Sequence, residues 1–139
     1  MREEKAMATP SAGANLGTLE TAMLDRIRQL GLETDPDFVL EFIDSYAPLF
    51  ERLHNSLLES HSKKDRSKIQ YAAHSLKGAS LNIGAADLAA VSRAIEDLSE
   101  QAEFATIDPL LQVLDVELKK TTQALLVIKT RISQGNSSK

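Results

Sequence analysis

The sequence predicts an all-α protein, an antiparallel four-helix bundle with an extra short N-terminal helix. Apolar residues recur every three or four positions along most of the chain, as they do on the buried face of a helix, and no stretch alternates like a strand. Hydrophobic residues make up 42% of the chain and aromatic residues only 4%, which is typical of a helical protein with an aliphatic core. The 139 residues are enough for one such core, so a second domain is not expected.

The first helix is predicted over residues 18–30. Its apolar positions have helical spacing and are Leu19, Met23, Ile27 and Leu30. Thr18 is the expected N-cap and Gly31 the expected stop. Residues 1–17 mix Ala, Gly, Ser, Thr and Pro without periodicity, so they are expected to form a flexible tail or linker.

The second helix is predicted to begin at Asp35-Pro36, where a capping side chain precedes a proline in the first turn. Its apolar stripe continues to about Ser60 and consists of Phe38, Phe42, Tyr46, Leu49, Phe50, Leu53 and Leu57. Pro48 interrupts the backbone hydrogen bonds of this pattern. Because the stripe continues in phase, a bend near Asp44 is expected and a break is not.

Three more helices complete the bundle. The third follows a polar turn at residues 61–65, with Asp65 as its candidate cap, and it loosens or ends at Gly84. The apolar residues of the fourth are Leu88, Val91, Ile95 and Leu98. The fifth starts at Asp108-Pro109 and ends near Gln134. The bundle therefore spans residues 18–134, and residues 135–139 are expected to form a disordered tail.

Composition excludes several classes of function. The net charge is −4 and the isoelectric point about 5.4, so the chain has no basic field to attract nucleic acid. It has no cysteine, which excludes disulfides and thiol catalysis. No apolar run approaches the roughly 18 residues that cross a membrane, and the N-terminus lacks the apolar core of a signal peptide. We expect a cytoplasmic monomer that does not bind membranes.

His74 is the most informative residue of the chain. At about 100° per residue, the third helix carries a core-facing stripe formed by Ile69, Ala72, Ala73, Leu76, Ser80 and Ile83. His74 lies on nearly the opposite face and is expected to be exposed to solvent. An exposed imidazole is largely neutral at pH 7 and offers one ring nitrogen as a nucleophile. We therefore interpret His74 as a phosphorylatable residue.

The neighbours of His74 favour this interpretation. Gly78 lies one turn further on, where a glycine costs roughly 1 kcal/mol relative to alanine, and its missing side chain leaves the ring accessible to a partner. Lys77 places an ammonium group within reach of a phosphoryl group on the ring. Ser80 faces the core, where its hydroxyl is expected to bond the Leu76 carbonyl.

The pattern His74-x-x-Lys77-Gly78-x-Ser80-x-x-x-Gly84 resembles the signature of histidine-containing phosphotransfer (HPt) domains of two-component phosphorelays. The order of the predicted helices also resembles the layout of that family. The resemblance implies a phosphocarrier that accepts a phosphoryl group on Nε2 of His74 from a receiver-domain aspartate and passes it to another response regulator. A hybrid sensor histidine kinase would stand upstream. The chain would need no cofactor of its own, because the receiver supplies Mg²⁺.

Two exposed residues beside His74, Tyr71 and Leu81, are candidates for receiver docking, and Ala85 is expected to extend that surface. His54 and His61 are interpreted as surface residues. Because the sequence contains no metal-ligand spacing such as HExxH, no metal site is expected.

Alternative functions remain open at this stage. An enzyme using His74 as a general base would need carboxylates or a metal around it, and the outer face of its own helix supplies none. The chain contains no GxxxxGK[ST] loop for binding ATP, which favours a phosphocarrier over an enzyme. A non-catalytic adaptor bundle and the phosphotransfer domain of a chemotaxis-type kinase are the other candidates. The sequence does not decide whether the chain is free-standing or part of a hybrid kinase.

Overall fold

The computed structural model describes residues 16–32, 35–100 and 103–137. Within these ranges the chain forms only helices: α2 (Thr18–Gln29), α3 (Pro36–Asp44), α4 (Tyr46–Ser62), α5 (Arg66–Ile83), α6 (Ala86–Leu98), a short 3₁₀ helix η1 (Phe104–Thr106) and α7 (Asp108–Ser137). The predicted all-α fold is confirmed. None of the helices in these ranges combines the length and the apolarity needed to cross a membrane.

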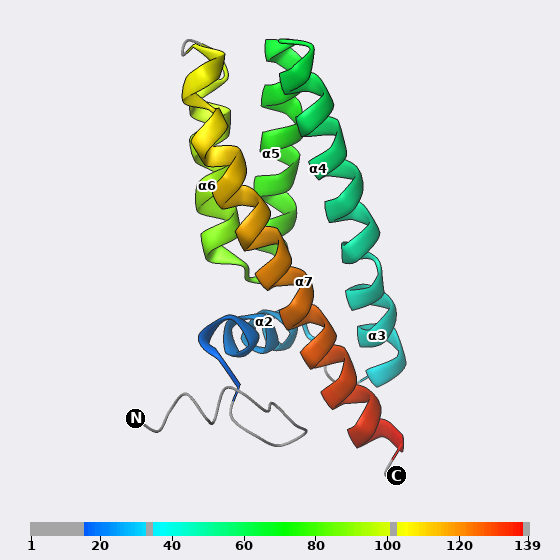
Figure 1. Cartoon of the computed structure of the whole chain (residues 1–139). Coiled ribbons are helices and arrows are strands. Elements are labelled where there is room, and N and C mark those ends of the chain that lie inside the picture. Colours follow the sequence, from blue (N-terminus) through cyan, green and yellow to red (C-terminus); the bar gives the residue numbers. More distant parts are fainter. Residues whose placement is uncertain (1–15, 33–34, 101–102, 138–139) are drawn as a thin grey trace, which may run out of the picture.

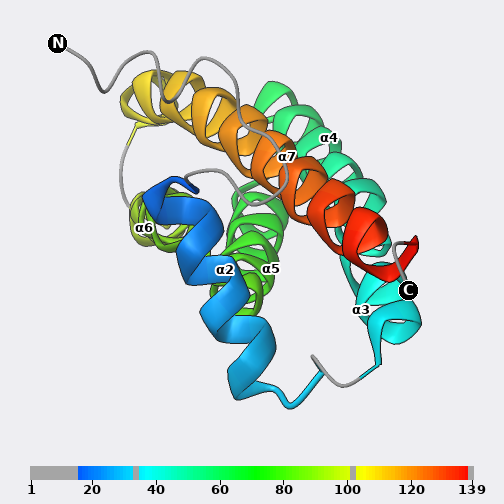
Figure 2. The same ribbon diagram turned by 90° about the horizontal axis from the view of Figure 1, so that it is seen from below.

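The helices α4, α5, α6 and the first half of α7 run side by side and antiparallel (Figure 1). The helix α5 packs most extensively against α6 and α4, while α7 covers α6 and then continues past α2 and α3. Figure 2 shows α2 lying across one end of the bundle, where it packs on α5 and α7. The predicted N-terminal helix therefore caps one end of the bundle.

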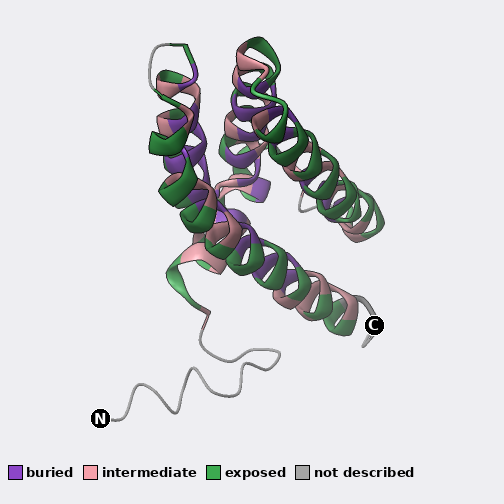
Figure 3. Ribbon diagram, turned by 45° about the horizontal axis from the view of Figure 1, so that its top comes forward, coloured by how far each residue is buried: buried purple, intermediate pink, exposed green. Residues whose placement is uncertain are grey.

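The core is aliphatic and each helix contributes one buried face to it (Figure 3). Its largest fully buried side chains are Phe50, Met23, Leu57, Ile69, Leu76, Ile83, Leu88, Ile95, Ile107, Leu114, Ile128 and Val39. Ser80 is also buried, and its hydroxyl donates to the Leu76 carbonyl at 2.6 Å, which confirms its structural interpretation.

The predicted second helix is divided into α3 and α4, so the expectation of a bend without a break is wrong. The interruption falls on Ser45, which keeps right-handed dihedrals (φ −74°, ψ −19°) and still donates its N–H to the Glu41 and Phe42 carbonyls at 3.1 and 3.3 Å. Pro48 explains the interruption, because it has no N–H for the Asp44 carbonyl and its ring crowds that carbonyl.

Two helix ends differ from the prediction. Gly17, not Thr18, is the N-cap of α2, because Gly17 has extended dihedrals and its carbonyl accepts the Thr21 N–H at 3.0 Å, whereas Thr18 is already helical. At the other end of the chain, α7 continues to Ser137, since Gly135 is accommodated inside the helix with open space around it. The remainder of the predicted tails, residues 1–15 and 138–139, lies outside the described residues.

The other predicted helix ends are confirmed. The side chains of Asp35 and Asp65 accept the backbone N–H of Phe38 and Lys68, each at 3.2 Å, and so cap α3 and α5. Gly84 ends α5 with a left-handed φ of +84°. Asp65 and Gly84 therefore mark the two ends of the helix that carries His74.

Candidate functional site

His74 lies in the middle of α5 on the face directed away from the core, and 63% of its side chain is exposed. Its neighbours Ala72, Ala73 and Leu76 are buried, which fixes the rotation of the helix and therefore the outward direction of the imidazole. His74 therefore lies on the outer face of α5, as the sequence predicts.

The imidazole does not stand alone, because Glu96 of α6 reaches it. The Nδ1 atom of His74 lies 2.8 Å from Oε2 of Glu96, and the Nζ atom of Lys77 lies 3.0 Å from Oε1 of the same carboxylate. Only 16% of the Glu96 side chain is exposed. The two oxygens of one mostly buried carboxylate therefore hold the ring on one side and an ammonium group on the other.

The carboxylate of Glu96 is ionised at neutral pH. Its burial alone raises the pKa, but the hydrogen bonds and positive charges of Lys77 and His74 outweigh burial and hold the pKa below the ordinary glutamate value of 4.5. Oε1 is buried, and the Lys77 ammonium 3.0 Å away compensates its charge.

This arrangement fixes which ring nitrogen is reactive. An ionised carboxylate can only accept hydrogen bonds, so a neutral His74 must donate to it from Nδ1–H. The other nitrogen, Nε2, then carries the free lone pair. The site can therefore present an exposed, unprotonated Nε2 as a nucleophile.

The structure places Lys77 differently from the sequence-based expectation. The sequence predicts a Lys77 ammonium within reach of a phosphoryl group on the ring, and in the structure this ammonium pairs with Glu96. The sequence does not point to Glu96, and His74 lacks a nearby carboxylate only on α5 itself. Only the packing of α6 against α5 brings Glu96 to the ring, and the sequence gives no signal of that alignment.

Gly78 leaves open space beside His74. It is exposed, and a Cβ atom added to it would have no neighbour within 4 Å. Packing inside the protein therefore does not require a glycine at this position. The open surface it creates lies one helical turn from the imidazole.

Two of the three predicted docking residues are exposed and the third is buried. Tyr71 and Leu81 lie on α5 on either side of His74 along the helix and are 72% and 56% exposed. Ala85, in contrast, is only 1% exposed, because it lies in the connection between α5 and α6 with its side chain in the core. Ala85 cannot extend a docking surface, and that expectation is wrong.

Neither of the other histidines belongs to the site. His61, expected at the surface, is mostly buried: its Nε2 lies 3.2 Å from the Phe104 carbonyl oxygen and 3.1 Å from the Asp108 carboxylate. It ties the end of α4 to η1 and the start of α7. Within the described part of the chain, no group of three or more His, Cys, Asp or Glu side chains is arranged to hold a metal.

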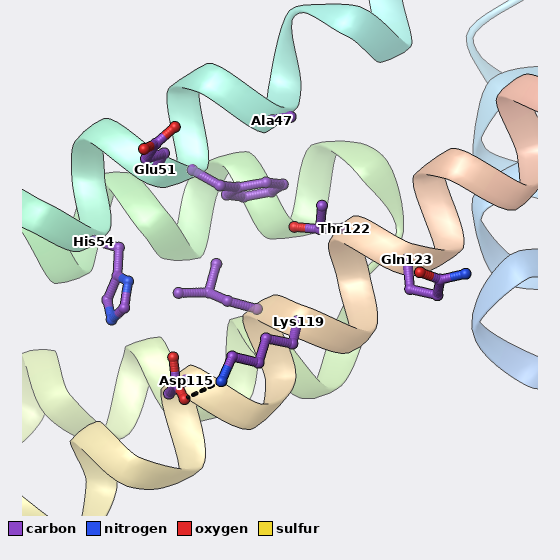
Figure 4. A pocket seen from close by; sticks show the side chains of 9 residues that line it. Ala47, Glu51, His54, Asp115, Lys119, Thr122 and Gln123 are labelled. Atoms are coloured by element: carbon purple, nitrogen blue, oxygen red, sulfur yellow. Dashed lines mark ion pairs between the residues drawn. The ribbon is translucent and has the colours of Figure 1, made fainter.

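His54 lines a groove of about 490 Å³ between α4 and α7 (Figure 4). Phe50 and Leu118 contribute its apolar lining, and Asp115 and Lys119 form an ion pair of 3.0 Å on the α7 side. All residues of this lining come from α4 and α7, so the groove is separate from His74 on α5.

The chain matches a known protein family. A family model described as Hpt domain matches residues 37–126, well over half of the chain, and this range contains His74, Lys77, Gly78 and Glu96. Neither the curated proteins nor the solved structures give a match.

Proposed function

The chain belongs to the Hpt family, whose domains are phosphocarriers of phosphorelay signalling and not kinase catalytic domains, and we propose that His74 is its phosphorylated residue. The observation that carries this proposal is the hydrogen bond between Nδ1 of His74 and the ionised Glu96. In the neutral imidazole this bond leaves the lone pair on Nε2, and the ring is exposed.

The proposed step is phosphoryl transfer between a receiver aspartate and His74. The Nε2 lone pair attacks the phosphorus of the aspartyl phosphate, an N–P bond forms, the P–O bond breaks, and the aspartate leaves as a carboxylate. The receiver contributes Mg²⁺ and its acidic residues, while this chain contributes the position of the nucleophile. The reverse step on a second receiver passes the phosphoryl group onward.

We propose that the partners are response-regulator receiver domains and an upstream hybrid sensor kinase, and that the protein acts as a monomer in the cytoplasm. The exposed surface around His74, formed by Tyr71, Gly78 and Leu81, supports receiver docking. Exposed apolar side chains beside the nucleophile suit contact with a protein partner.

The test is phosphoryl transfer from receivers. A panel of receiver domains, charged with a radiolabelled acyl phosphate in the presence of Mg²⁺, is incubated with the purified chain. We expect label on this chain that is labile in acid and stable in alkali, as a phosphohistidine is. If no receiver of a broad panel labels it, the proposal fails and an adaptor role becomes the better explanation.

Two substitutions of Gly78 test its effect on stability and its effect on phosphoryl transfer. Gly78→Ala should raise the free energy of unfolding by about 0.5–1 kcal/mol, because it adds a helix-favouring residue in open space. Gly78→Gln should slow transfer by about tenfold or more by placing a side chain where the receiver approaches. Urea unfolding and the transfer assay measure the two effects. Gly135→Ala, also in a helix and in open space, is the control and should leave transfer unchanged.

Docking by the apolar residues gives a second prediction. Tyr71→Ala and Leu81→Ala should each weaken receiver binding, measured by calorimetry, by roughly 1–2 kcal/mol, because exposed aromatic and aliphatic side chains supply buried area at such contacts. Their effect on folding should stay within about 0.5 kcal/mol. Leu126→Ala on α7 removes an equally exposed leucine remote from His74 and is the control. Equal weakening by all three variants would exclude this docking surface.

A further inference from the structure

The contact between His74 and Glu96 has a second consequence once the ring is phosphorylated; this step rests on the proposed function. When Nε2 forms its bond to phosphorus, the proton on Nδ1 remains and the ring becomes cationic. The Glu96 carboxylate, whose Oε2 lies 2.8 Å from Nδ1, is then an opposite charge in direct contact with that proton. An opposite charge at this distance favours the protonated ring.

The Nδ1 proton matters for the onward step. Transfer to the next receiver breaks the N–P bond, and the bonding electrons stay with the ring. If Nδ1 has kept its proton, the ring leaves as neutral imidazole. If Nδ1 has lost it, the ring must leave as an imidazolate anion, which is a far poorer leaving group. Protonation of Nδ1 therefore decides how readily phosphorylated His74 gives up its phosphoryl group.

We propose that Glu96 is a positioning residue that keeps Nδ1 of phosphorylated His74 protonated, so that the ring leaves as neutral imidazole in the onward transfer. Lys77 acts through Glu96: its ammonium, 3.0 Å from the buried Oε1, keeps the carboxylate charged in a site with little solvent. The lysine next to the phosphorylatable histidine thus supports the chemistry from the far side of the carboxylate.

The charged side chains nearest to Glu96 along the chain have other contacts. On α6, Arg93 and Asp97 are exposed and lie 4.0 Å from each other. In the turn after α6, Glu100 accepts a hydrogen bond from Gln70 of α5 at 2.7 Å. Among the described residues, α4 and α7 contribute no ion pair to His74 or Glu96. We therefore expect removal of the Glu96 carboxylate to change the protonation of Nδ1.

The test uses the full chain labelled with ¹⁵N and phosphorylated with phosphoramidate, a small N–P donor that needs no receiver. Long-range ¹H–¹⁵N NMR spectra follow Nδ1 of phosphorylated His74 between pH about 6 and about 9. In Glu96→Gln, which keeps an oxygen acceptor but removes the charge, we expect Nδ1 to lose its proton at a pH lower by roughly one unit or more than in the wild type. Glu100→Gln removes an equal charge from the turn that follows α6 and should leave that midpoint unchanged. The signals of His54 and His61 report whether the fold is intact.

A kinetic measurement complements the titration. Transfer from the phosphorylated chain to a receiver should slow by about tenfold per pH unit above the Nδ1 midpoint, and Glu96→Gln should enter this regime at lower pH than the wild type. Identical midpoints in the wild type and Glu96→Gln would overturn the role of Glu96. That outcome is distinct from a failure of the proposed function, in which charged receivers do not label His74 at all.

The unphosphorylated ring gives an independent readout. In the wild type at pH about 8, Nδ1 should carry the proton, whereas Glu96→Ala, which removes the acceptor, should allow the proton to move to Nε2. The same ¹⁵N spectra distinguish the two tautomers. An unchanged tautomer in Glu96→Ala would also count against the proposal.

Discussion

Replacing His74 with glutamine should abolish phosphoryl acceptance, with no label above background from any receiver that charges the wild type. Glutamine keeps a polar side chain of similar length but has no nucleophilic ring nitrogen. Because His74 is mostly exposed, the substitution should change the free energy of unfolding by less than about 1 kcal/mol. Radiolabel transfer and urea unfolding on the same preparation separate loss of chemistry from loss of fold.

The matched control for this variant is His54→Gln. His54 lies on α4 at the groove between α4 and α7, away from the α5 face that carries His74. The His54→Gln variant should be labelled to the same extent as the wild type. Persistent alkali-stable label on His74→Gln would place the phosphorylated residue elsewhere and contradict the proposed function.

The fold could be predicted from the sequence because each helix carries its own local signals. The stripe from Ile69 to Ile83 indicates which face of α5 is buried, and the capping residues Asp65 and Gly84 mark the ends of that helix. The same stripe predicts that His74 faces outward. These inferences depend on the geometry of a single helix, which sequence spacing determines.

The features that sequence analysis missed depend on contacts between helices or on competition at a single residue. Glu96 reaches His74 only through the relative alignment of α5 and α6, which no spacing within either helix encodes. Extending α5 beyond its end places Ala85 at the surface. The left-handed turn at Gly84 redirects the chain, however, and Ala85 is buried. At Ser45, the continuing apolar stripe favoured one helix, but the missing N–H of Pro48 interrupted it.

Gly84 should be the glycine where substitution destabilises the protein most. Its φ of +84° is left-handed, and a Cβ atom would lie 2.9 Å from the Ala22 carbonyl oxygen of α2. Gly84→Ala therefore combines backbone strain with a clash against the backbone of the capping helix, and the free energy of unfolding should fall by about 2–4 kcal/mol in urea denaturation. The clash also pushes α2 away from the end of α5.

Gly31→Ala separates the two causes of that loss. Gly31 has a similar φ of +74°, but a Cβ atom there would meet nothing within 4 Å, so this variant reports backbone strain alone, about 1–2 kcal/mol. The additional loss in Gly84→Ala measures how firmly α2 is held against the end of α5. If the two variants lose the same free energy, α2 moves at little cost and does not hold the end of the helix that carries His74. A clearly larger loss in Gly84→Ala means that the N-terminal helix is an integral part of the bundle and supports the helix that carries His74.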